Sequence, residues 1–259
     1  MSEIIIDGER IHYIEGGLTD PARPTVLMIH GAGQRTATWR YQLEAFKNHP
    51  AYNFIAPDLH GHGISEGSGF KDIAGYKGFI EEFADALRLN DLILAGHSMG
   101  GGVAMLFALD HPEKVRACVL AGTGARLRVA GETLKAVKNN YQAFCDSAPA
   151  RMLAPDSPEE LRKEFREGLL NTSPDVCYWD LVACDEFDIM ERVHEIKTPA
   201  CIISGEFDIL TPPKYGEHLK NSIKDSIYHL IHDAGHFMMQ EKSGEFNKVL
   251  RGFLITVVP

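Results

Sequence analysis

The sequence has no run of basic residues that could form a cationic stripe. Its 26 Lys and Arg residues are outnumbered by 36 Asp and Glu residues, so the formal net charge is −10 at pH 7. A nucleic-acid-binding surface needs clustered cations to neutralise phosphates. We therefore do not expect nucleic acid to be a partner of this protein.

Features of a leader peptide or a membrane span are also missing. The first residues carry acids at Glu3 and Asp7 and an apolar run of only three residues, which does not resemble a signal peptide. The longest stretch without a charged residue, 92–109, has the glycine-rich GHSMGGG at its centre, which makes a poor membrane helix. The sequence predicts a cytoplasmic protein with no membrane span.

Cysteine is scarce and is never found in Cys-x-x-Cys spacing. The five cysteines are odd in number and mostly have apolar neighbours. This usage excludes a disulfide framework and predicts buried free thiols in a reducing compartment.

The common cofactor motifs are absent as well. The sequence holds no G-x-x-x-x-G-K-[ST] and no complete G-x-G-x-x-G, so we expect no nucleotide cofactor. Asp58, His60 and His62 are residue types that bind metals, but no further ligand cluster accompanies them at a recognisable spacing. We therefore expect neither a metal nor any other cofactor.

The chain does contain short apolar runs that alternate with helical patterns. Helical spacing is found at 39–47, 79–87, 103–109, 215–219 and 245–253. The predicted strands are 3–7, 10–14, 25–30, 52–57, 92–96, 115–121, 200–204 and 226–231, the first two joined by a hairpin at Asp7-Gly8. Such an alternation predicts an α/β protein with a mostly parallel, eight-stranded sheet covered by helices on both faces.

One long interval interrupts the alternation. Residues 125–196 contain no convincing strand but include helical segments such as 134–144 and 159–170, separated by prolines. A connection of this length is too long for an ordinary loop, so we interpret it as a helical insertion over one edge of the sheet. The predicted organisation is a core of 1–124 and 197–259 with 125–196 inserted.

The most specific sequence feature surrounds Ser98. Gly96-His97-Ser98-Met99-Gly100 directly follows a predicted strand and directly precedes a helix. A serine there lies on a sharp turn, and the flanking glycines let the backbone pass close by. The alternative is a glycine-rich helix start with a serine cap.

A nucleophilic serine needs a base within hydrogen-bond reach and a third group that orients the base. Asp208 and His236 each follow a later apolar strand, which makes them the candidates for these roles. Their competitors beside the same strand ends are Glu206, Asp233 and His232.

Four sequence patterns are similar to those of serine-type α/β-hydrolases. They are HGAG (30–33), DLHGHGIS (58–65), GHSMGG (96–101) and the pair GEFD (205–208) and DAGHF (233–237), and the resemblance covers about 20–124 and 197–258. The resemblance implies the α/β-hydrolase fold, with Ser98 as nucleophile, His236 as general base and then acid, and Asp208 holding the imidazole tautomer. A serine rather than an aspartate at this position argues against haloalkane dehalogenases and epoxide hydrolases.

The resemblance also implies two backbone donors for an oxyanion. One is the N–H of Met99, which follows the nucleophile, and the other belongs to the HGAG turn, with Ala32 favoured and Gly33 as the alternative. In similar proteins, histidines placed like His30 and His97 pack or orient loops rather than act as the base.

The insertion lies where many members of the family carry a helical cap that shapes the substrate pocket. Its first part has four basic residues, Arg126, Arg128, Lys135 and Lys138, against the single acid Glu132. This charge either guides an anionic substrate, such as a carboxylated lactone or an acyl-CoA, or belongs to a solvated helix face.

Several residues are candidates for the pocket wall. We expect Gly33, Phe144 and Trp179 to line it. Aromatic and apolar side chains of the insertion, Phe144, Met152, Tyr178, Trp179 and Phe187, have a second interpretation, which is to seat the cap on the core.

These features predict a cofactor-independent Ser-His-Asp hydrolase (EC 3.1). It would cleave a small or medium carboxylic ester, lactone or thioester through an acyl-enzyme on Ser98. A carbon–carbon bond hydrolase, a cofactor-free haloperoxidase or a lyase would use the same three residues. A ligand receptor on this fold is a further alternative, whereas a pure interaction protein usually lacks the nucleophile or base that is present here.

Overall fold

The computed structural model describes residues 2–17 and 19–258, and its centre is one eight-stranded sheet. The strand order is β1-β2-β4-β3-β5-β6-β7-β8. Strand β2 runs antiparallel to both of its neighbours, and all other adjacent pairs are parallel. The bounds are β1 (Ser2–Ile6), β2 (Glu9–Glu15), β3 (Thr25–Ile29), β4 (Asn53–Pro57), β5 (Leu92–His97), β6 (Val115–Ala121), β7 (Ala200–Gly205) and β8 (Ser226–Ile231). The predicted α/β class and mostly parallel sheet are confirmed.

The central strands are apolar throughout because both of their faces are buried. In β3, Leu27 and Ile29 belong to one hydrophobic core, while Val26 and Met28 belong to a second core on the opposite face. This two-residue alternation follows from the pleat of a strand. The five cysteines are buried within the fold and free, as predicted.

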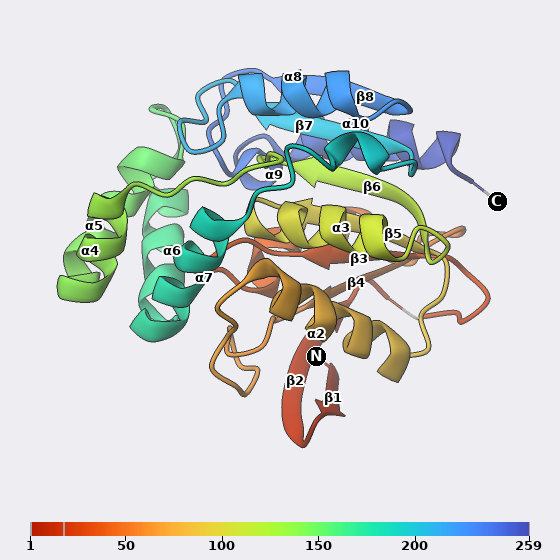
Figure 1. Ribbon diagram of the computed structural model, residues 1–259, viewed down its shortest axis with the longest axis horizontal. Coiled ribbons are helices and arrows are strands. Elements are labelled where there is room, and N and C mark those ends of the chain that lie inside the picture. The colour runs from red at the N-terminus through yellow and green to blue at the C-terminus, as the bar shows by residue number, and fades with distance from the viewer. Residues whose placement is uncertain (1, 18, 259) are drawn as a thin grey trace.

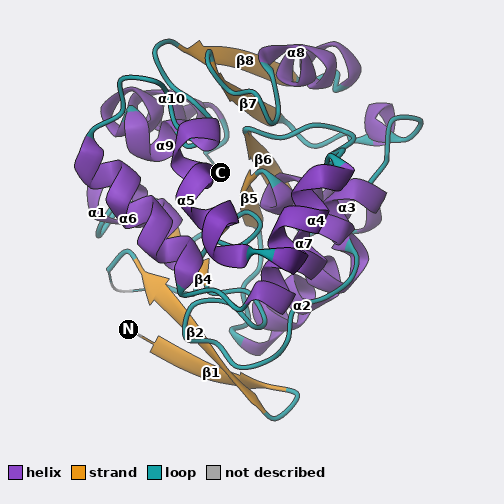
Figure 2. Cartoon of the chain, turned by 90° about the vertical axis from the view of Figure 1, so that its left-hand side faces the viewer, coloured by secondary structure: helices purple, strands orange, loops and turns teal. Residues whose placement is uncertain are grey.

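Helices cover both faces of the sheet (Figures 1 and 2). One face carries α2 (Ile73–Ala86), α3 (Met99–Asp110) and α8 (Pro213–Ser222), and the other carries α1 (Arg40–Ala45), α9 (Met238–Glu241) and α10 (Ser243–Thr256). Short 3₁₀ helices occur at Thr36–Trp39 and Val193–Glu195.

The hairpin between β1 and β2 turns at Asp7-Gly8, where both residues have positive φ (50° and 86°). This is the backbone conformation that an aspartate–glycine pair favours in a two-residue hairpin. The predicted turn is therefore confirmed.

The segment 125–196 forms four helices that gather at one end of the sheet (Figure 1). They are α4 (Gly131–Asn139), α5 (Tyr141–Met152), α6 (Glu159–Leu170) and α7 (Pro174–Glu186). The two ends of the segment are tied together, because the N–H of Ile189 donates to the carbonyl of Ala125 at 2.8 Å. The view in Figure 2 looks onto these helices, with the strands behind them.

The single helix predicted at 134–144 is wrong, because the chain breaks at Asn140. This residue has non-helical backbone angles (φ −154°, ψ 74°), and its side chain caps the following helix by accepting from the N–H of Ala143. An asparagine that caps a helix start competes with the continuation of the preceding helix. The helix predicted at 159–170 is α6.

Within residues 2–17 and 19–258, no helix is both long and apolar enough to cross a membrane.

Candidate active site

Ser98 lies at the sharp turn between β5 and α3. Its φ of 52° and ψ of −115° put a non-glycine residue in a rarely occupied backbone region. The surroundings hold it there: its N–H donates to the carbonyl of Ala121 at 3.0 Å, and the hydroxyl of Thr123 donates to its carbonyl at 2.8 Å. Strain that neighbouring groups maintain in this way is typical of functional sites.

The glycines around Ser98 are required by close packing of the backbone. A Cβ atom on Gly96 would lie 2.2 Å from the carbonyl oxygen of Gly100, and one on Gly100 would lie 2.3 Å from that of Ile29. Any larger residue at either position would force β3, β5 and α3 apart.

Asp208 and His236 meet beside this turn, at the ends of β7 and β8. The Nδ1–H of His236 donates to the Asp208 carboxylate at 2.7 Å, and the hydroxyl of Thr211 donates to the same oxygen at 2.7 Å. The other carboxylate oxygen accepts from the N–H groups of Leu210 and Thr211. Burial raises the pKa of Asp208, but the charge of His236 and these hydrogen bonds lower it below its usual value overall. Asp208 is therefore held as a carboxylate that fixes the imidazole.

Two neighbouring histidines support the site as neutral side chains. His97 donates from Nε2 to the carbonyl of His236 at 3.0 Å, and burial together with the nearby His236 ring lowers its pKa well below the usual value. His30 donates from Nδ1 to the carbonyl of Gly31 and accepts at Nε2 from the N–H of Leu59. Burial and the neighbouring His62 lower the pKa of His30 to about 4. Both rings thus bind backbone groups.

Two backbone N–H groups near Ser98 are left without a partner. Met99 is the first residue of α3, and Ala32 lines the same cavity as Ser98. In the described part of the chain, no hydrogen bond uses the N–H of either residue. The N–H of Gly33, in contrast, donates to the Asp180 carboxylate at 2.8 Å. Of the two HGAG candidates, the structure leaves only Ala32 free to bind an oxyanion.

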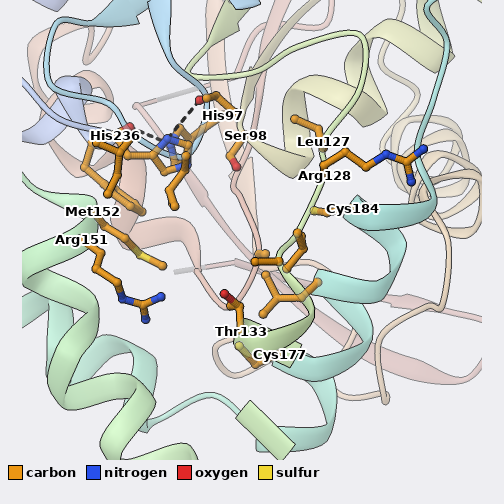
Figure 3. Close-up of a pocket in the computed structure, with 18 of the residues that line it drawn as sticks. His97, Ser98, Leu127, Arg128, Thr133, Arg151, Met152, Cys177, Cys184 and His236 are labelled. Carbon is orange, nitrogen blue, oxygen red and sulfur yellow. Dashed lines mark hydrogen bonds between the residues drawn. The ribbon is translucent and has the colours of Figure 1, made fainter. Parts of the chain in front are cut away.

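Ser98 and His236 face a cavity of about 260 Å³ between the sheet and the segment 125–196 (Figure 3). Its size is at the lower end of small-molecule sites, which are roughly 300–1,000 Å³. Most of its wall is apolar, formed by Ala32, Leu127, Val129, Ala130, Phe144, Met152, Leu169, Leu181, Ile209, Leu210 and Phe237. The remaining part of the wall, made of polar side chains and cysteines, comprises His97, Ser98, Arg128, Thr133, Arg151, Cys177, Cys184, Thr211 and His236.

Of the three residues expected to line the pocket, Phe144 does so, but Gly33 and Trp179 are not among the lining residues. Gly33 is turned towards Asp180 by the hydrogen bond described above. Trp179 lies on another side of α7, where the ammonium of Lys71 is 4.5 Å from its ring centroid. A linear sequence does not reveal which side of α7 faces the cavity.

The basic residues at the start of the segment are engaged within the protein. Arg126 binds Asp188 at 2.6 Å, Arg128 donates to the backbone carbonyl of Asp185 at 2.8 Å, Lys135 lies 3.8 Å from Glu132, and Lys138 lies over the Tyr178 ring. This placement favours structural and surface roles for most of this group.

Another buried carboxylate–histidine pair, which the sequence analysis did not identify, joins the segment to the core. Asp180 in α7 accepts from His62 Nε2 at 2.8 Å, from the Tyr76 hydroxyl and from the N–H of Gly33. His62 Nδ1 also donates, to the carbonyl of His60 at 3.1 Å. Burial lowers the pKa of His62, but the Asp180 carboxylate and the backbone acceptor outweigh this and raise it overall. The pair is a buried imidazolium–carboxylate ion pair.

The other residues of the 58–65 turn bind separate partners. Asp58 accepts from the His12 ring at 2.8 Å and from the N–H of Thr36, and His60 pairs with Glu9. Among the described residues, no group of three or more His, Cys, Asp or Glu side chains is arranged to hold a metal ion.

Comparisons with known proteins agree with this architecture. Residues 24–173 match the family model described as alpha/beta hydrolase fold. A solved thermophilic esterase is 33% identical, with a TM-score of 0.86 and coverage of 99% of this chain and 97% of the other. The enol-lactonase from Burkholderia xenovorans LB400 is 24% identical, with a TM-score of 0.91 and coverage of 98% and 100%.

A curated relative with another activity is 2-hydroxymuconate semialdehyde hydrolase from Pseudomonas sp. (strain CF600). It is 28% identical over 97% of this chain and 93% of its own length. The sharp turn at Ser98, the strand order and these matches agree, and the chain belongs to the alpha/beta hydrolase fold family.

Proposed function

We propose that this protein is a serine hydrolase that cleaves a small or medium carboxylic ester, lactone or thioester through an acyl-enzyme on Ser98. One observation carries the proposal. Ser98 on its strained turn, His236 with its partner Asp208, and Ala32 with its unused N–H meet at one apolar cavity, and Met99, whose N–H is also unused, directly follows Ser98. These are the parts that acyl transfer requires.

The roles follow from the hydrogen bonds. Asp208 holds the Nδ1–H tautomer of His236, so Nε2 carries the lone pair that takes the proton from the Ser98 hydroxyl during attack on the scissile carbonyl. The tetrahedral oxyanion is bound by the N–H groups of Ala32 and Met99, and the dipole of α3 adds to this stabilisation. His236 then protonates the leaving group and activates a water molecule that hydrolyses the acyl-enzyme.

The wall of the cavity supports this chemistry in two ways. Apolar side chains from the segment 125–196, such as Leu127, Val129 and Phe144, exclude bulk water around the reacting atoms. In such a site each hydrogen bond to the oxyanion is worth more than in water, and loss of one donor typically costs about 2.7–4 kcal/mol of transition-state stabilisation. We propose that this segment is the cap of the enzyme.

The experiment that tests the proposal compares the wild type with Ser98→Ala on p-nitrophenyl butyrate. Loss of a nucleophilic serine typically lowers kcat by roughly 10⁶-fold. A fluorophosphonate probe should label wild-type Ser98 and fail to label the variant. Ser222→Ala in α8 is the control and should keep full turnover and labelling. Equal turnover by the wild type and Ser98→Ala would contradict the proposal.

Carbon–carbon bond hydrolysis is the second candidate, because several curated relatives carry such names. Two of them are 2-hydroxymuconate semialdehyde hydrolase from Pseudomonas sp. (strain CF600) and a 2-hydroxy-6-oxononadienedioate hydrolase from Paraburkholderia phymatum, 27% identical to this chain. Comparing kcat/KM on 2-hydroxymuconate semialdehyde with kcat/KM on short methyl esters separates the candidates. A higher kcat/KM on 2-hydroxymuconate semialdehyde would favour carbon–carbon bond hydrolysis.

A further inference from the structure

The charge of the cavity wall is opposite to that of the whole protein. The chain has ten more acidic than basic residues, yet two arginines and no Asp or Glu line the cavity. Both arginines, Arg128 and Arg151, come from the segment 125–196. An apolar cavity with a positive wall is suited to a substrate that carries a negative group.

The two arginines differ in how they are neutralised. Arg128 lies 3.9 Å from Asp185 and 4.0 Å from Asp188, donates to the backbone carbonyl of Asp185, and has 57% of its side chain exposed. Its guanidinium points away from Ser98 (Figure 3). Solvent and these acids already satisfy Arg128.

Arg151, in the last turn of α5, has no acid within ion-pair distance among the described residues. Its neighbours are the hydroxyl of Ser147 at 3.4 Å and the Phe144 ring, whose centroid is 5.2 Å from the guanidinium carbon. The Nε atom is buried and has no hydrogen-bond partner in the described chain. Burial with no compensating anion lowers the pKa of Arg151, although an arginine remains charged at any working pH.

A partly buried cation without a counter-ion is costly for a folded protein unless a ligand supplies the missing charge. Figure 3 shows the Arg151 side chain extending from α5 into the side of the cavity opposite Ser98, where Thr133 is also placed. A guanidinium presents parallel N–H donors that match the two oxygens of a carboxylate.

We propose that Arg151 binds a carboxylate at the far end of the substrate's acyl group. This inference rests on the proposed ester hydrolysis. The substrate is then the monoester, or the lactone equivalent, of a dicarboxylic acid. Ser98 attacks the esterified carbonyl while the free carboxylate is held by Arg151, and the apolar wall contacts the carbon chain between them. The arginine that sets specificity is therefore not part of the basic group at 126–138.

The direct test uses paired esters of one acid. We compare kcat/KM for monomethyl esters of succinic, glutaric, adipic and suberic acid with kcat/KM for the corresponding dimethyl esters. The wild type should prefer the monoester at one chain length. In Arg151→Gln the monoester-to-diester ratio should fall by roughly 10–100-fold, which corresponds to a hydrogen bond between charged groups.

Two further variants make the result specific. Arg151→Lys keeps the charge but loses the paired donors, so its ratio should lie between those of the wild type and Arg151→Gln. Arg128→Gln is the matched control, because this arginine also lines the cavity, and it should keep the wild-type ratio. An unchanged ratio in Arg151→Gln, or an equal fall in Arg128→Gln, would overturn the proposal. A parallel fall in kcat/KM for monoester and diester would show a structural role and would also overturn it.

A binding measurement separates this inference from the proposed reaction. Adipate and glutarate should raise the Tm of Ser98→Ala and bind it in titration calorimetry, and Ser98→Ala/Arg151→Gln should lose both effects. Absence of dicarboxylate binding in Ser98→Ala would overturn the carboxylate site while Ser98-dependent ester hydrolysis stands. If dicarboxylates bind but the wild type hydrolyses no ester, the carboxylate site at Arg151 stands and the proposed function is rejected.

Discussion

Two of the buried carboxylate–histidine pairs in this protein have nearly the same geometry and different surroundings. Asp208 and His236 are 2.7 Å apart at the ends of β7 and β8, and Asp180 and His62 are 2.8 Å apart where α7 meets the core. The side chains of both aspartates are fully buried, and the two histidines are 4% and 0% exposed. By distance and burial alone, either pair resembles a catalytic base with its orienting acid.

What separates the pairs is the second nitrogen of each ring. His62 Nδ1 is occupied by the carbonyl of His60, so both of its nitrogens donate and the ring is held as a cation. His236 uses only Nδ1 for Asp208, and it lines the cavity that contains Ser98. A base needs a free lone pair and access to a proton, and of these two pairs only Asp208–His236 provides both. The Asp180–His62 pair is an ion pair that fastens α7 to the core.

The largest effect that this comparison predicts is on catalysis by Asp208→Asn. The amide no longer holds the productive imidazole tautomer, so kcat on p-nitrophenyl butyrate should fall by roughly 10⁴-fold. Asp233→Asn is the matched control at the end of β8, since Asp233 is exposed and its positive φ of 51° suits asparagine. A fall of less than about tenfold in Asp208→Asn would remove the distinction between the pairs.

Asp180→Asn should act mainly on stability. Breaking a buried ion pair leaves its partner uncompensated, and this typically costs about 3–5 kcal/mol of unfolding free energy. Urea unfolding measures the loss, with Asp175→Asn in the exposed first turn of α7 as the control. If Asp180→Asn leaves the unfolding free energy unchanged, the pair is not what fastens α7.

The pH dependence of stability should show the two kinds of histidine acting in opposite directions. His30 has its pKa lowered to about 4, so stability is lost as the pH falls from 6.5 towards 4, while the unfolded chain takes up the proton. With 1.36 kcal/mol per pKa unit, the His30 part of this loss amounts to about 3 kcal/mol, and His97, whose pKa is lowered in the same direction, adds to it. The lowered pKa of Asp208 affects stability mainly at pH values below its ordinary pKa of 3.8, and so adds little within this window.

His62 gives the opposite limb, because its folded pKa is raised. Its contribution is complete below pH 6.5 and is lost as the pH rises through the folded pKa. Unfolding free energies measured from pH 4 to 9 should therefore decline on both sides of pH 6.5. Asp180→Asn should lose the alkaline decline and keep the acid one. If the unfolding free energy declines equally above pH 6.5 in the wild type and Asp180→Asn, Asp180 is not what keeps His62 protonated.

The smallest expected effect is that of Thr211→Val. The variant removes the hydroxyl that donates to Asp208 at 2.7 Å but keeps the shape of the side chain. A hydrogen bond to a charged group contributes about 1.5–3 kcal/mol, so kcat should fall by at least roughly tenfold. Thr211→Ser keeps the hydroxyl and should recover most of the activity. Similar values for valine and serine would show that packing, not the hydrogen bond, matters here.

The sequence allowed prediction of the features that local patterns determine. Apolar runs that end in short polar or glycine-rich turns predict the strands, the sharp turn at Ser98 and the positions of Asp208 and His236. These features need only the pleat of a strand and the requirement for small residues where backbones approach closely.

Features that depend on side-chain direction across long sequence separations were missed. Asp180 gave one local signal, since it is an acid among the apolar residues of α7, but its partners His62 and Tyr76 are more than 100 residues away. Arg151 stands between Asp146 and Asp156 in the sequence, so the charge pattern did not single it out. Counting charges along the segment pointed instead to Arg126 and Arg128, which the fold pairs with Asp188 and Asp185.

The peptide around Gly33 has a consequence for engineering this fold. Its N–H donates to Asp180, and its carbonyl accepts from the hydroxyl of Thr172 at 2.9 Å. Two residues of the segment 125–196 therefore hold one glycine of the loop that carries Ala32. A chimaera that receives this segment from a relative without both groups should acquire a new specificity together with a displaced oxyanion loop. Transplanting substrate preference therefore requires that the acceptor and donor for Gly33 be transplanted with it.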